Sequence, residues 1–120
     1  MSKLTVYHYA KCGTCRKAVK WLQAAGHELE LHDLFETAPS TEVIHNWIER
    51  SGLESKKFFN VTGDAYKSLQ LKDKLPQMNE QEKIELLASN GRLIKRPVVD
   101  DGERVTVGFR ETEFIQIWGD

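Results

Sequence analysis

Two cysteines, Cys12 and Cys15, stand one helical turn apart in the stretch YHYAKCGTCRKA (7–18), and the sequence contains no others. A pair with this spacing can act as a redox couple, supply part of a metal site, or be two buried apolar side chains. Basic residues near the pair favour a thiolate over a thiol. They are Lys11, Arg16 and Lys17.

The position of Cys12 at the start of a helical pattern favours redox chemistry. The free amides of a first helical turn face outward, and the helix dipole adds about half a positive charge. A thiolate at Cys12 is therefore stabilised, and its pKa falls below the usual value of about 8.5. The same amides, those of Gly13, Thr14, Cys15 and Arg16, can bind an oxyanion. We expect Cys12 to be the nucleophile and Cys15 the resolving thiol.

The two other readings of the cysteine pair stay open at this stage. A structural zinc site needs about four ligands, and the sequence has no second Cys-x-x-Cys. Histidines could complete such a site, but none has the spacing of a zinc finger; they are His8, His27, His32 and His45. Cys15 also lies on an apolar helical stripe, which suits an inert buried thiol. We predict no metal and no bound cofactor, because two sulfurs can carry the electrons.

A β-α-β pattern surrounds the cysteines. Residues 3–9 and 27–33 alternate like strands, and the helix between them ends at Gly26. Its apolar stripe consists of Cys15, Ala18, Val19, Leu22 and Ala25. A helical crossover of this length predicts two parallel strands.

The middle of the chain is predicted to be helical. Ser40 is an N-cap for a helix that ends near Gly52, and one or two short helices follow around Gly63. Asn79 and Glu82 form a capping-box pattern that opens a further helix.

Strands return near the end of the chain, at 95–99 and 104–109, with a two-residue hairpin turn predicted at Asp101-Gly102. A last helix, about 111–118, is expected to pack through three apolar residues, which are Phe114, Ile115 and Trp118. The order predicts an α/β fold of the thioredoxin/glutaredoxin type: a β-α-β half and a β-β-α half, with a helical insertion of about 37–91 between them. We expect a single domain over residues 1–120.

The composition narrows the class of protein. The net charge of −1, from 17 basic and 18 acidic residues, gives no field that would draw the chain to nucleic acid or to an anionic membrane. No apolar run is long enough for a membrane span, and the N-terminus lacks the pattern of a signal peptide. We predict a cytoplasmic protein with no direct nucleic-acid or membrane partner.

The stretch YHYAKCGTCRKA and the later motifs RPVV and VGFRETEF together resemble the bacterial arsenate reductase family and its Spx-type relatives, over essentially the whole chain. The resemblance implies that Cys12 is the nucleophile and that Arg96 and Arg110 contact an oxyanion. It also implies that Pro97 is a cis-proline facing the cysteine. At Asn60 an oxyanion-binding arginine of the reductase pattern is missing.

Cys15 also departs from the reductase pattern, in which serine stands at this position and glutathione supplies the second thiol. The Cys-x-x-Cys instead resembles the Spx-like branch, where the pair is an intramolecular redox switch. From the residues alone, plainer readings remain: Arg96 and Arg110 as solvated surface residues, Pro97 as the opening of an edge strand, and His8 as a structural histidine rather than one that tunes the thiolate.

Two functions follow as hypotheses. In the first, the chain is an oxidoreductase in which Cys12 attacks a disulfide or an oxyanion such as arsenate, Cys15 resolves the adduct, and a thioredoxin- or glutaredoxin-like thiol donor restores the dithiol. In the second, the same pair is the redox switch of a regulator that binds RNA polymerase.

Overall fold

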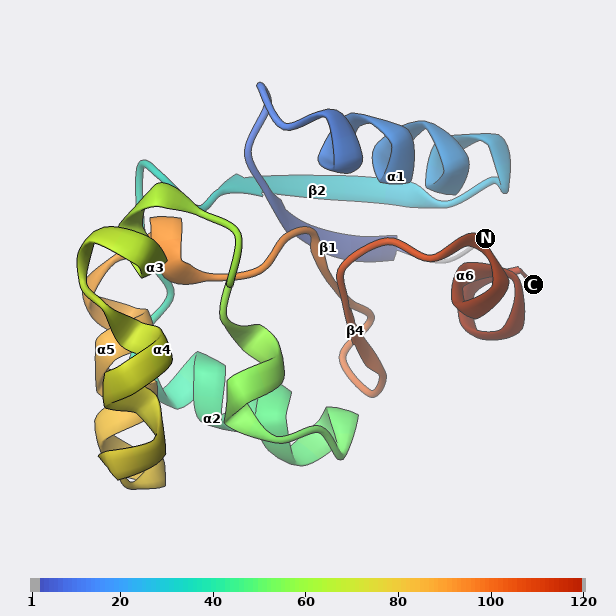
Figure 1. Ribbon diagram of the computed structural model, residues 1–120. Helices are drawn as coiled ribbons and strands as arrows, with labels where there is room; N and C mark the ends of the chain where they lie inside the picture. Colours follow the sequence, from blue (N-terminus) through green and yellow to red (C-terminus); the bar gives the residue numbers. More distant parts are fainter. Residues whose placement is uncertain (1–2, 120) are drawn as a thin grey trace. The chain divides into compact units, whose positions relative to one another are not determined.

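The computed structural model describes residues 3–119, and the chain divides into two compact units. The first comprises the residues up to Asp33 and those from Arg96 onward, and the second is Leu34–Lys95. Figure 1 shows the strands in the first unit and a group of short helices in the second. The predicted insertion of about 37–91 lies inside the second unit. That the two units form a single domain stays a prediction.

The first unit has the predicted β-α-β and β-β-α halves. The first half is β1 (Lys3–His8), α1 (Gly13–Ala24) and β2 (Glu28–Asp33), and the second is β3 (Val98–Asp100), β4 (Val105–Val107) and α6 (Glu111–Trp118). The sheet has the order β2-β1-β3-β4. As predicted, β1 and β2 are parallel, whereas β3 is antiparallel to both β1 and β4.

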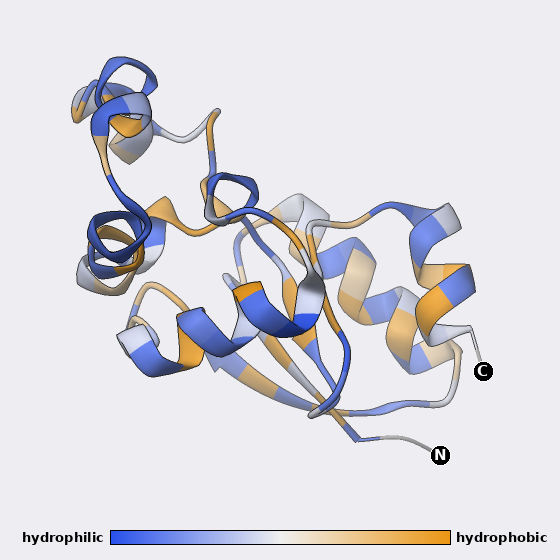
Figure 2. Ribbon diagram, turned by 90° about the horizontal axis from the view of Figure 1, so that it is seen from below, coloured by the Kyte–Doolittle hydropathy of each residue, from blue (hydrophilic) through white to orange (hydrophobic). Residues whose placement is uncertain are grey.

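The core of this unit forms where α1 and α6 pack against one face of the sheet. Val6 and Val99 are paired on neighbouring strands and are fully buried, and the helices cover them with apolar side chains. The buried cluster is Leu4, Val6, Ala18, Leu22, Val99, Phe114 and Trp118. Figure 2 shows alternating apolar and polar bands on α6, next to the label C, as expected for a helix with one buried face.

Three details of the second half differ from the sequence prediction. The strands are shorter than 95–99 and 104–109, since the ladder pairs join only Val98–Asp100 and Val105–Val107. At the start of β3, Pro97 has no amide to donate to the ladder. Ile115 is 58% exposed, since it lies on the far side of α6 from Phe114 and Trp118, which share one face at a spacing of four residues.

The hairpin turn is the third difference. The last ladder pair is Asp100↔Val105, and the amide of Asp101 donates a backbone hydrogen bond to the carbonyl of Arg104 (3.2 Å). The two central residues of the turn are therefore Gly102 and Glu103 instead of the predicted Asp101 and Gly102. Asp101 organises this connection, because its Oδ1 accepts hydrogen bonds from the amides of Glu103 (2.8 Å) and Arg104 (2.6 Å). Partial burial opposes ionisation of Asp101, but these amides and the Arg104 guanidinium outweigh it and lower the pKa of the carboxyl.

The second unit consists of short helices with the predicted caps. They are α2 (Thr41–Ser51), η1 (Ser55–Phe58), α3 (Asp64–Ser68), α4 (Leu71–Lys74), η2 (Leu75–Gln77), α5 (Glu80–Ser89) and η3 (Gly91–Leu93). Ser40 accepts a hydrogen bond from the Val43 amide and Gly52 ends α2 in the left-handed region, while Asn79 and Glu82 form the capping box of α5. These caps confirm the sequence prediction.

Aromatic packing stabilises this unit. Trp47 of α2 stacks on Phe58 of η1 with ring centroids 6.1 Å apart, and Ser55 donates a hydrogen bond to Glu80 of α5 (2.9 Å).

Among the described residues of the whole chain, no helix combines the length and the apolar character needed to cross a membrane.

Gly91 provides a test of the packing in the second unit. A Cβ atom at this position would collide with the backbone carbonyl of Leu34, which cannot move aside as a flexible side chain can. We expect Gly91→Ala to lower the free energy of unfolding by about 1–3 kcal/mol, measured by urea denaturation. Gly13→Ala is the matched control, because a Cβ at Gly13 has nothing within 4 Å. Equal stability of the two variants would contradict the close contact.

Candidate functional site

Strand pairing brings two distant segments of the first unit together. Because β1 and β3 are antiparallel with Tyr7 opposite Val98, the residues that follow β1 lie beside the residues that precede β3. Continuing this register places Tyr9 next to Arg96, and the Arg96 guanidinium indeed lies 5.8 Å from the centre of the Tyr9 ring. The loop that leads to Cys12 therefore faces Arg96-Pro97.

Cys12 is the N-cap residue of α1 and has an extended backbone conformation. Its amide donates to the carbonyl oxygen of Tyr9 (3.0 Å) and its own carbonyl accepts from the amide of Arg16 (3.0 Å). The guanidinium of Arg16 donates to the carbonyl of Lys11 (3.4 Å), so it braces the loop from outside. These bonds hold the Cys12 thiol at the positive end of the helix dipole.

The environment of Cys12 favours the thiolate. Partial burial acts to raise the pKa of this thiol, but hydrogen bonds from the backbone and thiol of Cys15, together with the hydrogen bond and the positive charge of Arg96, lower the pKa below its usual value. Cys12 is only partly buried, so its thiolate can meet a second molecule. The sequence prediction of a lowered pKa at Cys12 agrees with this direction.

Cys15 has the opposite environment. It faces the core at 0% exposure, and this burial is the main cause that raises the pKa of its thiol to about 12, with the neighbouring Cys12 adding to the rise. A hydrogen bond from the Tyr9 backbone and the charge of Arg96 offset part of it. The two thiols are within hydrogen-bonding reach of each other, and both are free.

The Arg96-Pro97 peptide bond is cis, as expected from the resemblance. Pro97 is buried, and its carbonyl accepts a hydrogen bond from the amide of Gly108 (2.8 Å), which extends the pairing of β3 with β4 by one residue. Arg96 is thereby held at the start of β3, at the end of the sheet where Cys12 lies.

Tyr9 is a residue that sequence reasoning missed. Its carbonyl accepts a hydrogen bond from the amide of Cys12, and its backbone amide donates one to the thiol of Cys15. Its ring lies beside the Arg96 guanidinium. The available signal was its place in the last stretch before Cys12, opposite Arg96 in an antiparallel register. That register could not be read without knowing which strands pair.

The other predicted site residues are less closely tied to Cys12. Gly13 and Thr14 are exposed on the first turn of α1, where their amides remain candidates for binding an anion. Arg110 follows β4 at the end of the sheet where Cys12 lies. Its guanidinium is exposed and pairs with Glu113 (3.2 Å). A role for these three residues stays a prediction.

His8 has its own set of charged neighbours. Burial is the main cause that lowers the pKa of its imidazole, the Asp33 carboxylate acts to raise it, and His32 acts to lower it further. Asp33 is its partner on β2. A lowered pKa favours the neutral form of His8, and its tuning of Cys12 stays a prediction.

Asn60, where the resemblance predicts that an arginine is missing, belongs to the second unit. Its Oδ1 accepts a hydrogen bond from the Thr62 hydroxyl (3.3 Å).

Within residues 3–119, His, Cys, Asp and Glu side chains form no group of three or more that could hold a metal ion.

Comparisons with known proteins agree with the resemblance seen in the sequence. The model of the ArsC family matches residues 7–117. The chain is 54% identical to the uncharacterised protein YusI of Bacillus subtilis, over 96% of this chain and 98% of YusI. It is 26% identical to the regulatory protein MgsR of the same species, over 96% and 90% of the two chains. It is also 26% identical to the global transcriptional regulator Spx of Lactiplantibacillus plantarum, over 90% and 80%.

Solved structures show the same fold. An ArsC family related protein from Bacteroides fragilis superposes with a TM-score of 0.91 at 43% identity, covering 94% of this chain and 95% of the other. A protein from Streptococcus mutans described as a possible arsenate reductase has a TM-score of 0.84 at 43% identity, with 92% and 93% covered. A glutaredoxin from Archaeoglobus fulgidus, at 15% identity, has a TM-score of 0.51 with 100% and 89% covered, which confirms the thioredoxin-like fold.

The opposite environments of the two thiols predict a selective reaction with iodoacetamide. We expect Cys12 to be alkylated with a midpoint below the pH at which a free thiol ionises, because Arg96 and Cys15 stabilise its thiolate. Arg96→Met should move this midpoint upward. Mass spectrometry of the peptide 12–16 over a pH series measures both, with Arg104→Met, at the hairpin, as the control. A midpoint that does not differ between the wild type and Arg96→Met would contradict the assignment of Arg96.

Proposed function

Because this chain belongs to the ArsC family, we propose that it is a cytoplasmic thiol-disulfide oxidoreductase in which Cys12 is the nucleophile and Cys15 the resolving thiol. Its relatives include proteins described as arsenate reductases and as transcriptional regulators, so the family by itself leaves the reaction open. The proposal assigns a reaction class to this chain within the family. It rests on the chemistry of the thiol pair.

The single observation that carries the proposal is the division of the pair into one activated and one protected thiol. The pKa of Cys12 is lowered while that of Cys15 is raised to about 12. A nucleophile must be ionised and accessible, whereas a resolving thiol must stay protonated until the first step is complete. Two inert structural cysteines would need neither the charge of Arg96 nor the helix N-terminus.

The reaction has two exchange steps. The Cys12 thiolate attacks one sulfur of a substrate disulfide, forms a mixed disulfide, and releases the other sulfur as a thiolate. Cys15 then loses its proton and attacks the Cys12 sulfur, which gives the Cys12–Cys15 disulfide and releases the second substrate thiolate. The substrate gains two electrons and the protein loses two. A thioredoxin- or glutaredoxin-like dithiol supplies two electrons to restore the pair.

The first step itself prepares the second. While Cys12 is a thiolate, its negative charge helps to raise the pKa of Cys15. This charge disappears once Cys12 is in a mixed disulfide, so Cys15 ionises more easily at the moment when it must attack. The environment therefore favours resolution only after substrate has been bound covalently.

An oxyanion such as arsenate can replace the disulfide if the Cys12 thiolate bonds to arsenic while one oxygen leaves as water. Attack of Cys15 on the Cys12 sulfur then forms the Cys12–Cys15 disulfide and releases arsenite, which has gained the two electrons. The amides of Gly13 and Thr14 at the helix N-terminus, with Arg16 and Arg96, would hold the oxyanion beside Cys12, and Arg110 would add a further contact. Asn60 argues against arsenate as the preferred substrate, because an amide supplies no charge. Disulfides are therefore the favoured substrate class.

Reduction of a small disulfide such as hydroxyethyl disulfide, coupled to thioredoxin or glutaredoxin, tests this function. We expect Cys12→Ser to reduce turnover to background, since no other thiolate is activated. Arg96→Met should lower the rate at pH 7 by about tenfold, the value of one charge-assisted hydrogen bond. Cys15→Ser should trap a mixed disulfide that mass spectrometry detects, and Lys20→Gln serves as the control. Full turnover by Cys12→Ser would refute the proposal, and full turnover by Cys15→Ser would mean that an external thiol resolves the intermediate.

A second function, a redox-switched regulator that binds RNA polymerase, is favoured by the Cys-x-x-Cys together with the similarity to MgsR and Spx over most of the chain. In that case the Cys12–Cys15 disulfide is a signal rather than a catalytic intermediate. The near-neutral charge of −1 suits a protein partner better than direct contact with DNA.

Affinity capture of RNA polymerase under oxidising and reducing conditions distinguishes the two functions. For a regulator we expect polymerase subunits to be recovered with the oxidised wild type and lost with Cys12→Ser, which cannot form the disulfide. For an oxidoreductase we expect no polymerase with either protein, alongside turnover of the disulfide substrate. Recovery that does not change with redox state would exclude the switch.

A further inference from the structure

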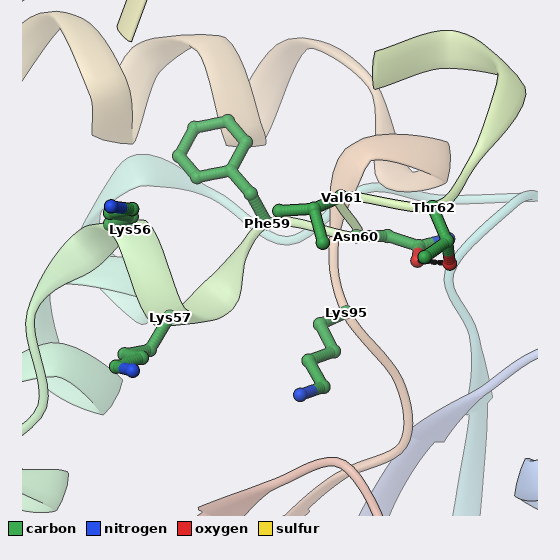
Figure 3. A pocket seen from close by; sticks show the side chains of 7 residues that line it. All are labelled: Lys56, Lys57, Phe59, Asn60, Val61, Thr62 and Lys95. Atoms are coloured by element: carbon green, nitrogen blue, oxygen red, sulfur yellow. Dashed lines mark hydrogen bonds between the residues drawn. The ribbon is translucent and has the colours of Figure 1, made fainter. Parts of the chain in front are cut away.

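The second unit contains a pocket of about 300 Å³, and of its lining residues only Asn60 entered the argument about function above. This volume is at the lower end for ligand sites, so the pocket suits a small molecule. Three of its lining residues are lysines, and no lining residue is acidic. The residues are Lys56, Lys57, Phe59, Asn60, Val61, Thr62 and Lys95 (Figure 3).

Backbone pairing brings lysines that are distant in the sequence together here. The amide of Lys95 donates to the carbonyl of Phe58 (2.7 Å), and the amide of Asn60 donates to the carbonyl of Leu93 (2.7 Å). These bonds flank an isolated bridge between Phe59 and Ile94. Figure 3 shows Lys57 of η1 and Lys95 projecting to the same side of the segment from Phe59 to Thr62.

The lysines of this pocket lack carboxylate partners at ion-pair distance among the described residues. In the part of the chain that the structure describes, no ion pair involves Lys56, Lys57 or Lys95. All three are exposed. Ammonium groups of like charge around one small volume repel one another, and their summed field attracts an anion.

The polar groups of the pocket that remain available are mostly donors. The Asn60 Oδ1 is occupied by the Thr62 hydroxyl, which leaves the Asn60 NH₂ group to donate. Within residues 3–119, the backbone amides of Val61 and Thr62 have no protein acceptor. A ligand that matches three ammonium groups and these N–H groups must bring acceptor oxygens and negative charge.

We propose that this pocket binds a small anion with two or more negative charges, carried on phosphate or carboxylate groups. Lys57 and Lys95, from two segments of the chain, supply the charge, Lys56 adds to the field, and Asn60 donates a hydrogen bond. This site belongs to the second unit and does not depend on the proposed redox function.

Titration of the ¹⁵N-labelled full chain with inorganic pyrophosphate and, separately, with citrate tests the site by NMR. We expect saturable shifts of the amides of residues 56–62 and 95, and binding that weakens as salt rises. Lys57→Gln and Lys95→Gln should each weaken binding about fivefold. Lys74→Gln, which removes an exposed lysine of the same unit outside the pocket, is the matched control and should leave binding unchanged. Binding of pyrophosphate alone identifies phosphate as the ligand chemistry, and binding of citrate alone identifies carboxylate.

The proposal is overturned if neither anion saturates these amides at about 10 mM, or if Lys74→Gln weakens binding as much as Lys57→Gln does. It is also overturned if the shifts are confined to residues 11–16, since the anion then binds the helix N-terminus beside Cys12. This outcome would overturn the anion site without contradicting the proposed redox function. A failure of the disulfide-reduction assay would in turn not contradict anion binding in the pocket.

Discussion

The antiparallel pairing of β1 with β3 is the constraint on which the candidate site depends. It sets the end of β1 against the start of β3, and so it joins Tyr9 and the Cys12 loop to Arg96-Pro97 across most of the sequence. Without this register, Cys12 would retain the helix dipole of α1 but lose the guanidinium. The hydrogen bond from Gly108 to Pro97 then extends the ladder to β4 and anchors the same end of the sheet.

A single helical turn separates two opposite chemical environments. Cys12 precedes the helix and is partly exposed to solvent, whereas Cys15, three residues later, faces the core with Ala18 and Leu22. Burial destabilises a charged sulfur, and nearby N–H groups and cations stabilise one. The spacing of the cysteines thus places one thiol, with a lowered pKa, where it is partly exposed, and the other, with a raised pKa, in the core within reach of the first.

The two units carry different kinds of information about function. The first contains the thiol pair. The family model matches residues 7–117, which include both units, and this match defines the family and leaves the role open. The second contains Asn60 among three lysines. Flexible lysines act as point charges whereas arginine binds oxyanions through a planar fork, so the charged groups of this pocket differ in kind from the arginine of the reductase pattern.

Local signals in the sequence determined most of the elements, and long-range pairing decided the site. The strand before Cys12, the stripe of α1, the Ser40 cap and the Asn79–Glu82 capping box could all be predicted, because each depends on residues within a few positions of one another. The hairpin connection at Asp101 and the exposure of Ile115 were predicted wrongly, since ladder register and the covering of a helix face depend on distant partners. Arg96 was linked to Cys12 by resemblance only, and neither Tyr9 nor the lysine pocket was anticipated. Side chains this far apart in the chain meet only when strands pair, and a short sequence pattern contains no information about that pairing.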